Sequence, residues 1–211
     1  MNTLKVATFL LVAGLSIAHA ETAALDPSAH RALAPVQEQS PCQTHQTRTG
    51  FTLPDPACSP GAINPTVSLE VLRDSLFTTR LLRDAVTSHR EKEVLYARYG
   101  LEHPEHNRGK EQICELDHIV PLELGGADSL DNIFPMCDTR PVPFAERSFH
   151  LKDIVEHYLS WAVRSGQIPL ETAQQDIAQD WTRHLNAALA ACPQGRCPSW
   201  RGPALSALTE F

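Results

Sequence analysis

The chain has 211 residues, of which 42% are hydrophobic, and it carries 18 Lys+Arg against 25 Asp+Glu. This apolar content is sufficient for a packed core and excludes a chain that is disordered throughout. The 16 prolines and 10 glycines exclude a collagen-like or low-complexity protein. The formal net charge of −7 argues against a protein that coats nucleic acid through bulk positive charge.

The first twenty residues have the parts of a secretory signal peptide. Lys5 supplies positive charge, residues 7–18 form an apolar stretch, and Ala18-His19-Ala20 is a small-x-small cleavage pattern. The apolar stretch is too short to span a membrane. We therefore expect an exported protein, periplasmic or extracellular, with no membrane attachment after the signal is removed. Removal leaves 17 basic and 25 acidic residues, a net charge of −8.

Six cysteines lie downstream of this signal, in a compartment that we expect to be oxidising. Six cysteines allow 15 pairings, and proximity along the chain favours bonds between sequence neighbours. The alternative is a structural zinc site, but such sites usually present C-x₂₋₄-C pairs, and only the last two cysteines come near that spacing. The favoured disulfides are Cys42–Cys58, Cys114–Cys137 and Cys192–Cys197.

The N-terminal half of the mature chain divides into an irregular part, a helical part and a loop. Residues 21–66 hold seven of the sixteen prolines and no apolar periodicity, which predicts an irregular arm stapled by Cys42 and Cys58. From Ser68 the apolar residues recur at helical spacing, which predicts one long helix or two shorter ones ending at Gly100. Residues 101–113 are polar and predict a loop.

Two short apolar runs, 114–120 and 130–134, flank a Gly-Gly pair and predict a β-hairpin with a broad loop. Apolar stripes then predict one helix over about 148–165 and another over about 169–190. We expect one domain over residues 67–191, with its core at about 112–165. Residues 192–211 form a short tail.

The predicted hairpin carries the residues suited to chemistry. Asp117 and His118 end its first strand, Asn132 follows 14 residues after His118, and the next helix carries His150 and His157. A neutral imidazole can accept a proton from water at neutral pH, and an amide can orient that imidazole. A carboxylate and an imidazole can hold a divalent metal that neutralises charge on a scissile phosphate. Because neighbouring side chains on a strand point to opposite faces, Asp117 and His118 need a bend at the strand end to act together.

The run from Asp117 to Pro135 resembles the HNH endonuclease motif on the ββα-metal (His-Me finger) hairpin. It contains Asp-His-Ile-Val-Pro-Leu, then Gly-Gly, then Asn-Ile-Phe-Pro. Flanking segments at 58–65, 99–101, 150–153 and 173–181 resemble a group of exported bacterial HNH-like proteins, so the resemblance covers roughly residues 56–181. It implies an α+β fold: a ββα-metal hairpin-helix core with flanking α-helices and an irregular, disulfide-stapled N-terminal arm.

The resemblance also implies roles for single residues. His118 would be the general base, Asp117 a metal ligand, and Asn132 the residue that orients the base. The second ligand is expected on the helix, where His150 is nearest if an insertion containing Pro141 and Pro143 is assumed. His157 lies on a similar helix face and is the substitute. The cofactor would be one divalent metal ion, Mg²⁺ or Mn²⁺, with Zn²⁺ or Ni²⁺ as alternatives.

The prediction is therefore an exported metal-dependent endonuclease that hydrolyses DNA, with RNA as an alternative substrate. Arg147 and Lys152 are candidate phosphate contacts, although charged residues on a helix are usually only hydrated. The chain departs from the group at residues 76–86, where a second cysteine and a Trp- and Pro-containing stretch are missing. Two alternatives stay open: an inactive HNH-fold module that binds nucleic acid or protein, and a secreted toxin or effector nuclease with an immunity protein as partner.

Overall fold

The computed structural model describes residues 41–83 and 94–200, which all belong to one structural unit. The predicted signal peptide, residues 21–40 of the predicted arm and residues 201–211 of the predicted tail lie outside the described residues. The described part is mixed α+β, with two small antiparallel sheets, several helices and disulfides.

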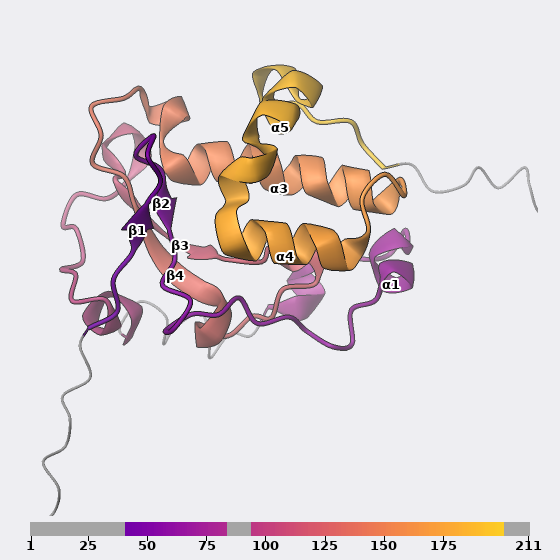
Figure 1. The fold of residues 1–211 in the computed structure, drawn as a ribbon, viewed down its shortest axis with the longest axis horizontal. Helices are drawn as coiled ribbons and strands as arrows, with labels where there is room; N and C mark the ends of the chain where they lie inside the picture. Colours follow the sequence, from indigo (N-terminus) through magenta and orange to yellow (C-terminus); the bar gives the residue numbers. More distant parts are fainter. Residues whose placement is uncertain (1–40, 84–93, 201–211) are drawn as a thin grey trace, which may run out of the picture. The chain divides into compact units, whose positions relative to one another are not determined.

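A two-stranded antiparallel sheet followed by a long helix forms the centre of the fold. Strand β3 (Cys114–His118) pairs with β4 (Ile133–Cys137), and helix α3 (Ser148–Arg164) packs along both strands (Figure 1). Phe134 and Met136 of β4 are fully buried in the same hydrophobic cluster as the apolar side of α3. The predicted hairpin and the helix after it are therefore confirmed.

The second strand begins three residues later than its apolar run suggested. Residues Leu130–Asn132 form a 3-10 turn, and the strand continues through Pro135, which lies opposite Leu116. Opposite residues in an antiparallel pair alternate between hydrogen-bonded and non-hydrogen-bonded positions, and the bond from Ile119 N to Asn132 O fixes which are which. Pro135 falls at a non-hydrogen-bonded position, so its nitrogen points away from β3. Since β3 is the only strand that pairs with β4 among the described residues, the missing N–H of Pro135 costs the sheet no hydrogen bond.

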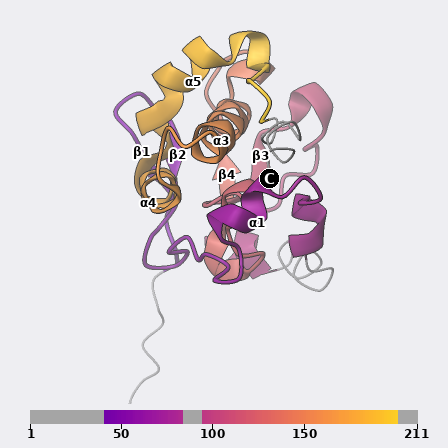
Figure 2. The ribbon, with the colours of Figure 1, turned by 90° about the vertical axis from the view of Figure 1, so that its right-hand side faces the viewer.

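The helical region after α3 is one predicted helix in the sequence and two helices in the structure. Helix α4 (Leu170–Asp180) ends at the 3-10 turn η6 (Trp181–His184), and α5 (Leu185–Ala191) follows. The break has a local cause, because the side chain of Asp180 accepts a hydrogen bond from Thr182 N and starts a new turn. In Figure 2, α3 is seen nearly end-on, with α5 on one side and the strands β3 and β4 on the other.

The described part of the predicted arm packs on the domain. It contains a small hairpin of β1 (His45–Gln46) and β2 (Thr52–Leu53), and the Trp181 indole donates a hydrogen bond to Thr52 O at 3.0 Å. Further along, Asn64 N donates to Gly125 O in the loop of the central hairpin. Residues on the two sides of the boundary predicted at residue 66 are therefore in direct contact.

Between Ser68 and Arg83, less helix forms than the apolar spacing predicted. Helix α1 (Leu69–Arg73) begins at Ser68, whose hydroxyl accepts from Val71 N, and it ends after five residues. A 3-10 turn follows at Thr79–Leu82, and residues 94–98 are helical, while residues 84–93 lie outside the described part. Gly100 ends the last helical segment as predicted, because it adopts a φ of +61° that favours glycine.

All six cysteines form the three disulfides favoured by sequence proximity: Cys42–Cys58, Cys114–Cys137 and Cys192–Cys197. The zinc alternative is wrong, because none of the six thiols is free. Disulfides of this number favour an oxidising, extracellular environment. Within residues 41–83 and 94–200, the structure contains no helix with the length and apolar content needed to span a membrane.

Candidate functional site

A cavity of about 370 Å³ lies at the carboxyl end of β3, between this strand, α3 and the 3-10 turn η3 (Leu122–Leu124). Asp117 and His118 both line this cavity. The strand ends at His118, and the backbone bends at the next two residues. The bend expected from the sequence therefore brings two neighbouring side chains to one cavity.

His118 is paired with a carboxylate that the sequence analysis did not single out. Its Nε2 lies 2.8 Å from Asp128 Oδ1, and the two side chains are 13% and 3% exposed. Burial lowers the pKa of His118, although the hydrogen bond that the ring donates to Asp128 opposes this effect. With Nε2–H donating to Asp128, Nδ1 of the neutral ring keeps its lone pair. The only sequence signal for Asp128 was a carboxylate two residues after the Gly-Gly pair.

Asn132 holds the hairpin loop, and its amide is engaged there rather than on the imidazole. Its Oδ1 accepts from Val120 N at 2.9 Å, and its Nδ2 donates to Val120 O and Ala127 O, each at 2.8 Å. The residue is completely buried. A Cβ on neighbouring Gly126 would lie 1.8 Å from Val120 O, so only glycine fits beside this network. Asn132 thus acts on His118 through the backbone of the loop.

Lys152 is not a phosphate contact. Its side chain is 1% exposed, and its Nζ lies 2.9 Å from Asp117 Oδ2 and 2.6 Å from His118 O. It also pairs with Glu156, one turn further along α3. Burial would lower the pKa of Lys152, but the two carboxylates outweigh it and hold that pKa above its ordinary value. The ammonium group therefore joins the hairpin to the helix at the site.

Carboxylates crowd the cavity around Asp117. Burial raises the pKa of each of four acidic side chains in its lining, and repulsion by neighbouring carboxylates raises them further. For Glu115 the pKa rises to about 7, mainly through burial and then through repulsion by Asp117. Carboxylate oxygens are the donors that hard divalent cations prefer. In donor chemistry the cavity therefore fits such a cation. The four side chains are Glu115, Glu123, Asp153 and Glu156.

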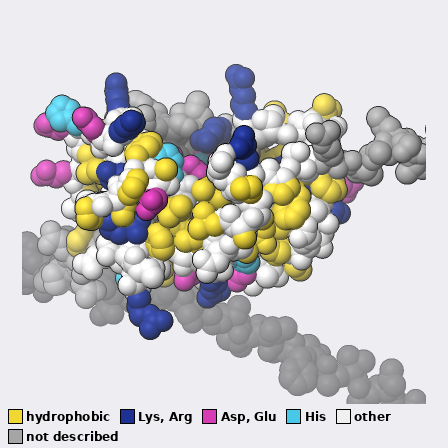
Figure 3. Space-filling model, turned by 90° about the horizontal axis from the view of Figure 1, so that it is seen from above, with side chains coloured by type: hydrophobic (Ala, Val, Ile, Leu, Met, Phe, Trp, Pro, Cys, Tyr) yellow, Lys and Arg dark blue, Asp and Glu magenta, His cyan; other side chains and the backbone are white. Residues whose placement is uncertain are grey.

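The structure does not bring His150 to this cavity. Its ring packs against Phe144 and Phe149, with centroids 4.3 and 4.8 Å away. It lines a mainly apolar cavity of about 670 Å³ between α3, α5 and the 3-10 turn η5 (Phe144–Glu146), which adjoins the first cavity at Asp153 and His157. Figure 3 shows apolar side chains gathered over the face that carries α5. The substitute histidine, His157, lines the cavity of His118, and its Nε2 lies 4.0 Å from Glu123.

Arg147 serves the start of α3 rather than the cavity. Its guanidinium donates to Asp138 O at 2.6 Å. The carboxylate of Asp138 accepts from Ser148 N at 2.7 Å, at the positive end of the helix dipole. Burial raises the pKa of Asp138, but hydrogen bonds from Arg140 and Ser148 outweigh it and lower that pKa to about 2. The arginine that does line the cavity is Arg83.

Within the described residues, only one group of three ligand-type side chains has its donor atoms within 4.8 Å of one another, and none of its members lines the cavity of Asp117. The group consists of Cys42, Asp55 and Cys58. Both sulfurs belong to a disulfide and so offer no thiolate, while Asp55 accepts a hydrogen bond from Gln43 N. This group therefore contains a structural disulfide and is not a metal site.

Comparison with known proteins adds no relative: no family model, no curated protein and no solved structure matches this chain. The assignment of a function therefore depends on the geometry of the cavity at Asp117 and His118.

Proposed function

We propose that this protein is an exported, metal-dependent endonuclease of HNH type that hydrolyses DNA phosphodiester bonds at the cavity of Asp117 and His118. The observation that carries the proposal is the His118–Asp128 pair, with a 2.8 Å contact, at the end of a strand in a β-β-α unit. A buried imidazole held by a carboxylate is a suitable general base.

His118 supplies the base chemistry. Its lowered pKa keeps the imidazole neutral near neutral pH, so the ring is ready to accept a proton from water. Asp128 fixes the tautomer and stabilises the imidazolium that forms when the proton is taken up. Asn132 keeps the loop that carries Asp128 in place through its bonds to Val120 and Ala127.

The carboxylates supply the metal site. Asp117 would hold one divalent cation, with Asp153 and Glu156 as the neighbouring oxygen donors. When bound, the cation compensates the negative charge of the scissile phosphate and the leaving oxygen. An oxygen-rich donor set favours Mg²⁺ or Mn²⁺ over Zn²⁺ or Ni²⁺. A phosphodiester brought to this acidic cavity without a cation would be repelled.

The charge of the whole chain shapes how it would bind DNA. After signal removal the net charge is −8, so affinity must come from local contacts and from the bound cation. We expect weak, salt-sensitive binding rather than tight occupancy. The three disulfides suit an exported enzyme that works outside the cytoplasm.

The test is plasmid digestion by the mature, oxidised protein with Mg²⁺ or Mn²⁺, with EDTA, and by the variant His118→Ala. His106→Ala, in an exposed loop, is the matched control. We expect cleavage with metal, none with EDTA or His118→Ala, and full cleavage with His106→Ala. Cleavage by His118→Ala at the parent rate would remove His118 as the base. Single-stranded and structured RNA in parallel reactions would define the substrate.

One observation favours the alternative of an inactive binding module. The ammonium of Lys152 already pairs with Asp117, the first proposed metal ligand, at 2.9 Å. If the protein is such a module, it would cut no DNA or RNA with any divalent metal, but it would still bind nucleic acid or a protein partner. The toxin or effector alternative, with its immunity protein, stays a prediction from the resemblance.

A further inference from the structure

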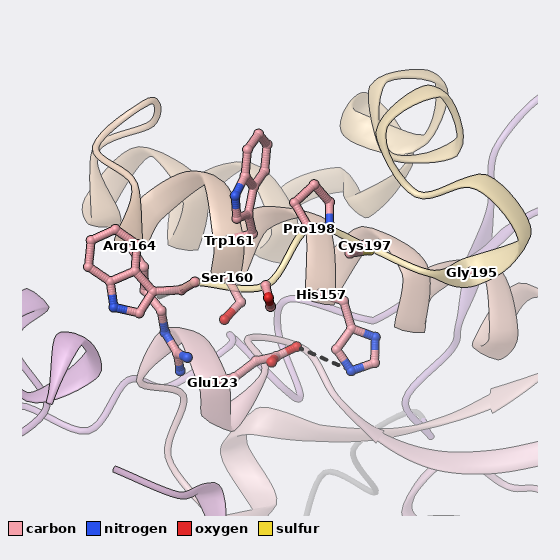
Figure 4. A pocket seen from close by; sticks show the side chains of 10 residues that line it. Glu123, His157, Ser160, Trp161, Arg164, Gly195, Cys197 and Pro198 are labelled. Carbon is pink, nitrogen blue, oxygen red and sulfur yellow. Dashed lines mark ion pairs between the residues drawn. The ribbon is translucent and has the colours of Figure 1, made fainter. Parts of the chain in front are cut away.

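A second cavity, of about 390 Å³, adjoins the first, because Glu123 and His157 line both. It lies between the carboxyl-terminal half of α3 and the segment 195–200, which the Cys192–Cys197 disulfide ties to the end of α5. In Figure 4 the Glu123 carboxylate points toward α3, with Arg164 on one side and His157 on the other. The volume of this second cavity is in the range of small-molecule binding sites in proteins.

Two hydrogen-bond donors in the lining of this cavity have no acceptor among the described residues. They are Nε of Arg164 and Nε1 of Trp200, and both atoms are buried. A buried N–H group without a partner is costly, so native structures rarely leave one unpaired. Two such groups in one cavity indicate that a ligand with hydrogen-bond acceptors belongs there.

Aromatic and cationic side chains also meet at this cavity. The indoles of Trp161 and Trp200 are part of its lining, and the guanidinium carbon of Arg73 lies 5.7 Å from the centroid of the Trp200 ring. Aromatic rings that stack on bases, together with arginines, are the usual means by which proteins bind unpaired nucleotides. The ligand indicated by this lining is therefore flat and aromatic.

The Glu123 side chain further restricts the chemical class of ligand that fits this cavity. Its carboxylate accepts hydrogen bonds, whereas the neighbouring Arg164 donates them. The edge of a nucleobase offers both amino or imino donors and ring or carbonyl acceptors, so it matches this pair. A bare phosphate would match Arg164 but would face the Glu123 carboxylate. We propose that this cavity is a nucleobase subsite, in which Glu123 and Arg164 bind the edge of an unpaired base and the Trp200 indole stacks on its face.

The subsite gives the proposed nuclease a substrate preference, and to that extent it depends on the proposed function. Because the two cavities share Glu123 and His157, a strand cleaved at His118 would place a neighbouring nucleotide in the second cavity. A base paired in a duplex cannot enter such a pocket without leaving its stack. The protein should therefore prefer single-stranded nucleic acid or unpaired nucleotides.

Binding is measured in the full mature chain carrying His118→Ala, so that no cleavage interferes. The probe is a fluorescein-labelled single-stranded DNA 12-mer of mixed sequence, compared by anisotropy with its blunt duplex at one fixed salt concentration. We expect the single strand to bind more tightly. In that background, Trp200→Ala should weaken single-strand binding about 5- to 150-fold, the range for one stacked base. Arg164→Met should weaken it as well, and Trp200→Phe should restore most of it.

The controls separate the subsite from general loss of charge or folding. Arg183→Met removes an exposed arginine that pairs with Asp176, and Leu189→Ala trims an exposed apolar residue of α5. Both should bind like the background, and all variants should keep the background circular dichroism spectrum and melting temperature. Equal binding by Trp200→Ala, Arg164→Met and the background would overturn the subsite, as would a duplex bound as tightly as the single strand.

The two proposals fail in different ways. If the unmodified protein cuts no nucleic acid but the His118→Ala protein binds the single strand through Trp200, the subsite stands and the nuclease assignment falls. If the protein cuts plasmid DNA and the Trp200 and Arg164 variants bind normally, the reverse holds.

Discussion

The imidazole of His118 and the carboxylate of Asp128, ten residues apart in the chain, lie 2.8 Å from each other across the loop of the central hairpin. The loop brings them together because Asn132 closes it through hydrogen bonds to Val120 and Ala127. The pair is the feature of the site that most closely constrains its chemistry, since it fixes which ring nitrogen carries the proton.

Asp128→Asn should reduce kcat about 10²- to 10⁴-fold, because the amide neither fixes the productive tautomer nor stabilises the imidazolium. The carboxylate raises the pKa of His118 against the effect of burial, so its loss lowers that pKa further. The acidic limb of the pH–rate profile should therefore move to lower pH. Steady-state rates between pH 4 and 9 check this. Asp131→Asn, an exposed carboxylate of the same loop, should leave rate and profile unchanged.

Asn132→Ala should lower the free energy of unfolding by about 2–4 kcal/mol, because it leaves buried backbone groups of Val120 and Ala127 without partners. Urea unfolding followed by circular dichroism measures this change. Asn186→Ala, on the exposed side of α5, should stay within about 0.5 kcal/mol of the parent. A parent-like stability for Asn132→Ala would show that the loop is held by other contacts.

Lys152→Met should destabilise the protein by about 3–5 kcal/mol, since it leaves Asp117 and Glu156 buried without their cation. The double variant Lys152→Met/Glu156→Leu should recover part of this loss, because one of the two uncompensated carboxylates is gone. Lys110→Met removes an exposed lysine of the 3-10 turn Gly109–Glu111 and should be neutral. Urea unfolding of the two single variants and the double variant measures this coupling. The prediction is wrong if the losses in free energy of unfolding of the two single variants simply add up in the double variant.

Asp138→Asn should destabilise the protein by roughly 1.5–3 kcal/mol at pH 6, because hydrogen bonds to a charged carboxylate are stronger than those to an amide. The folded pKa of Asp138 is lowered to about 2, below its unfolded value. Its contribution is therefore present above pH 4 and is lost as pH falls through 2. Thermal melts at pH 2, 4 and 6 should show parent and variant converging at the lowest pH. A constant difference would assign the effect to packing.

Cys114→Ala/Cys137→Ala should cost about 3 kcal/mol of stability, because this disulfide closes a loop of sequence separation 23 that contains the whole loop of the central hairpin. The Cys192–Cys197 disulfide closes a loop of sequence separation only 5, so Cys192→Ala/Cys197→Ala should cost about 2 kcal/mol of stability. Urea unfolding of both double variants gives the comparison. The order would be reversed if native-state strain, and not loop entropy, decided the effect.

The sequence by itself determined the features that depend on local pattern. The two apolar runs around Gly125-Gly126 predicted the hairpin, and the stripe after Ser148 predicted α3, because periodicity reports which face of an element is buried. Proximity and an even count also predicted the three disulfides. Asp117 and His118 reached one cavity as expected, because the strand ends in a bend.

Only the tertiary structure decided which side chains meet at that cavity. Lys152 and Glu156 are brought to the site by packing of α3 on the hairpin, and Asp128 is brought to His118 by the closed hairpin loop; no local spacing encodes these contacts. The same packing turned His150 toward Phe144, away from the cavity. The tertiary structure also joins the 3-10 turn after α4 to the N-terminal hairpin, because the indole of Trp181 donates a hydrogen bond to Thr52 O. Periodicity tells which face of an element is buried, whereas the identity of its neighbours depends on the whole fold.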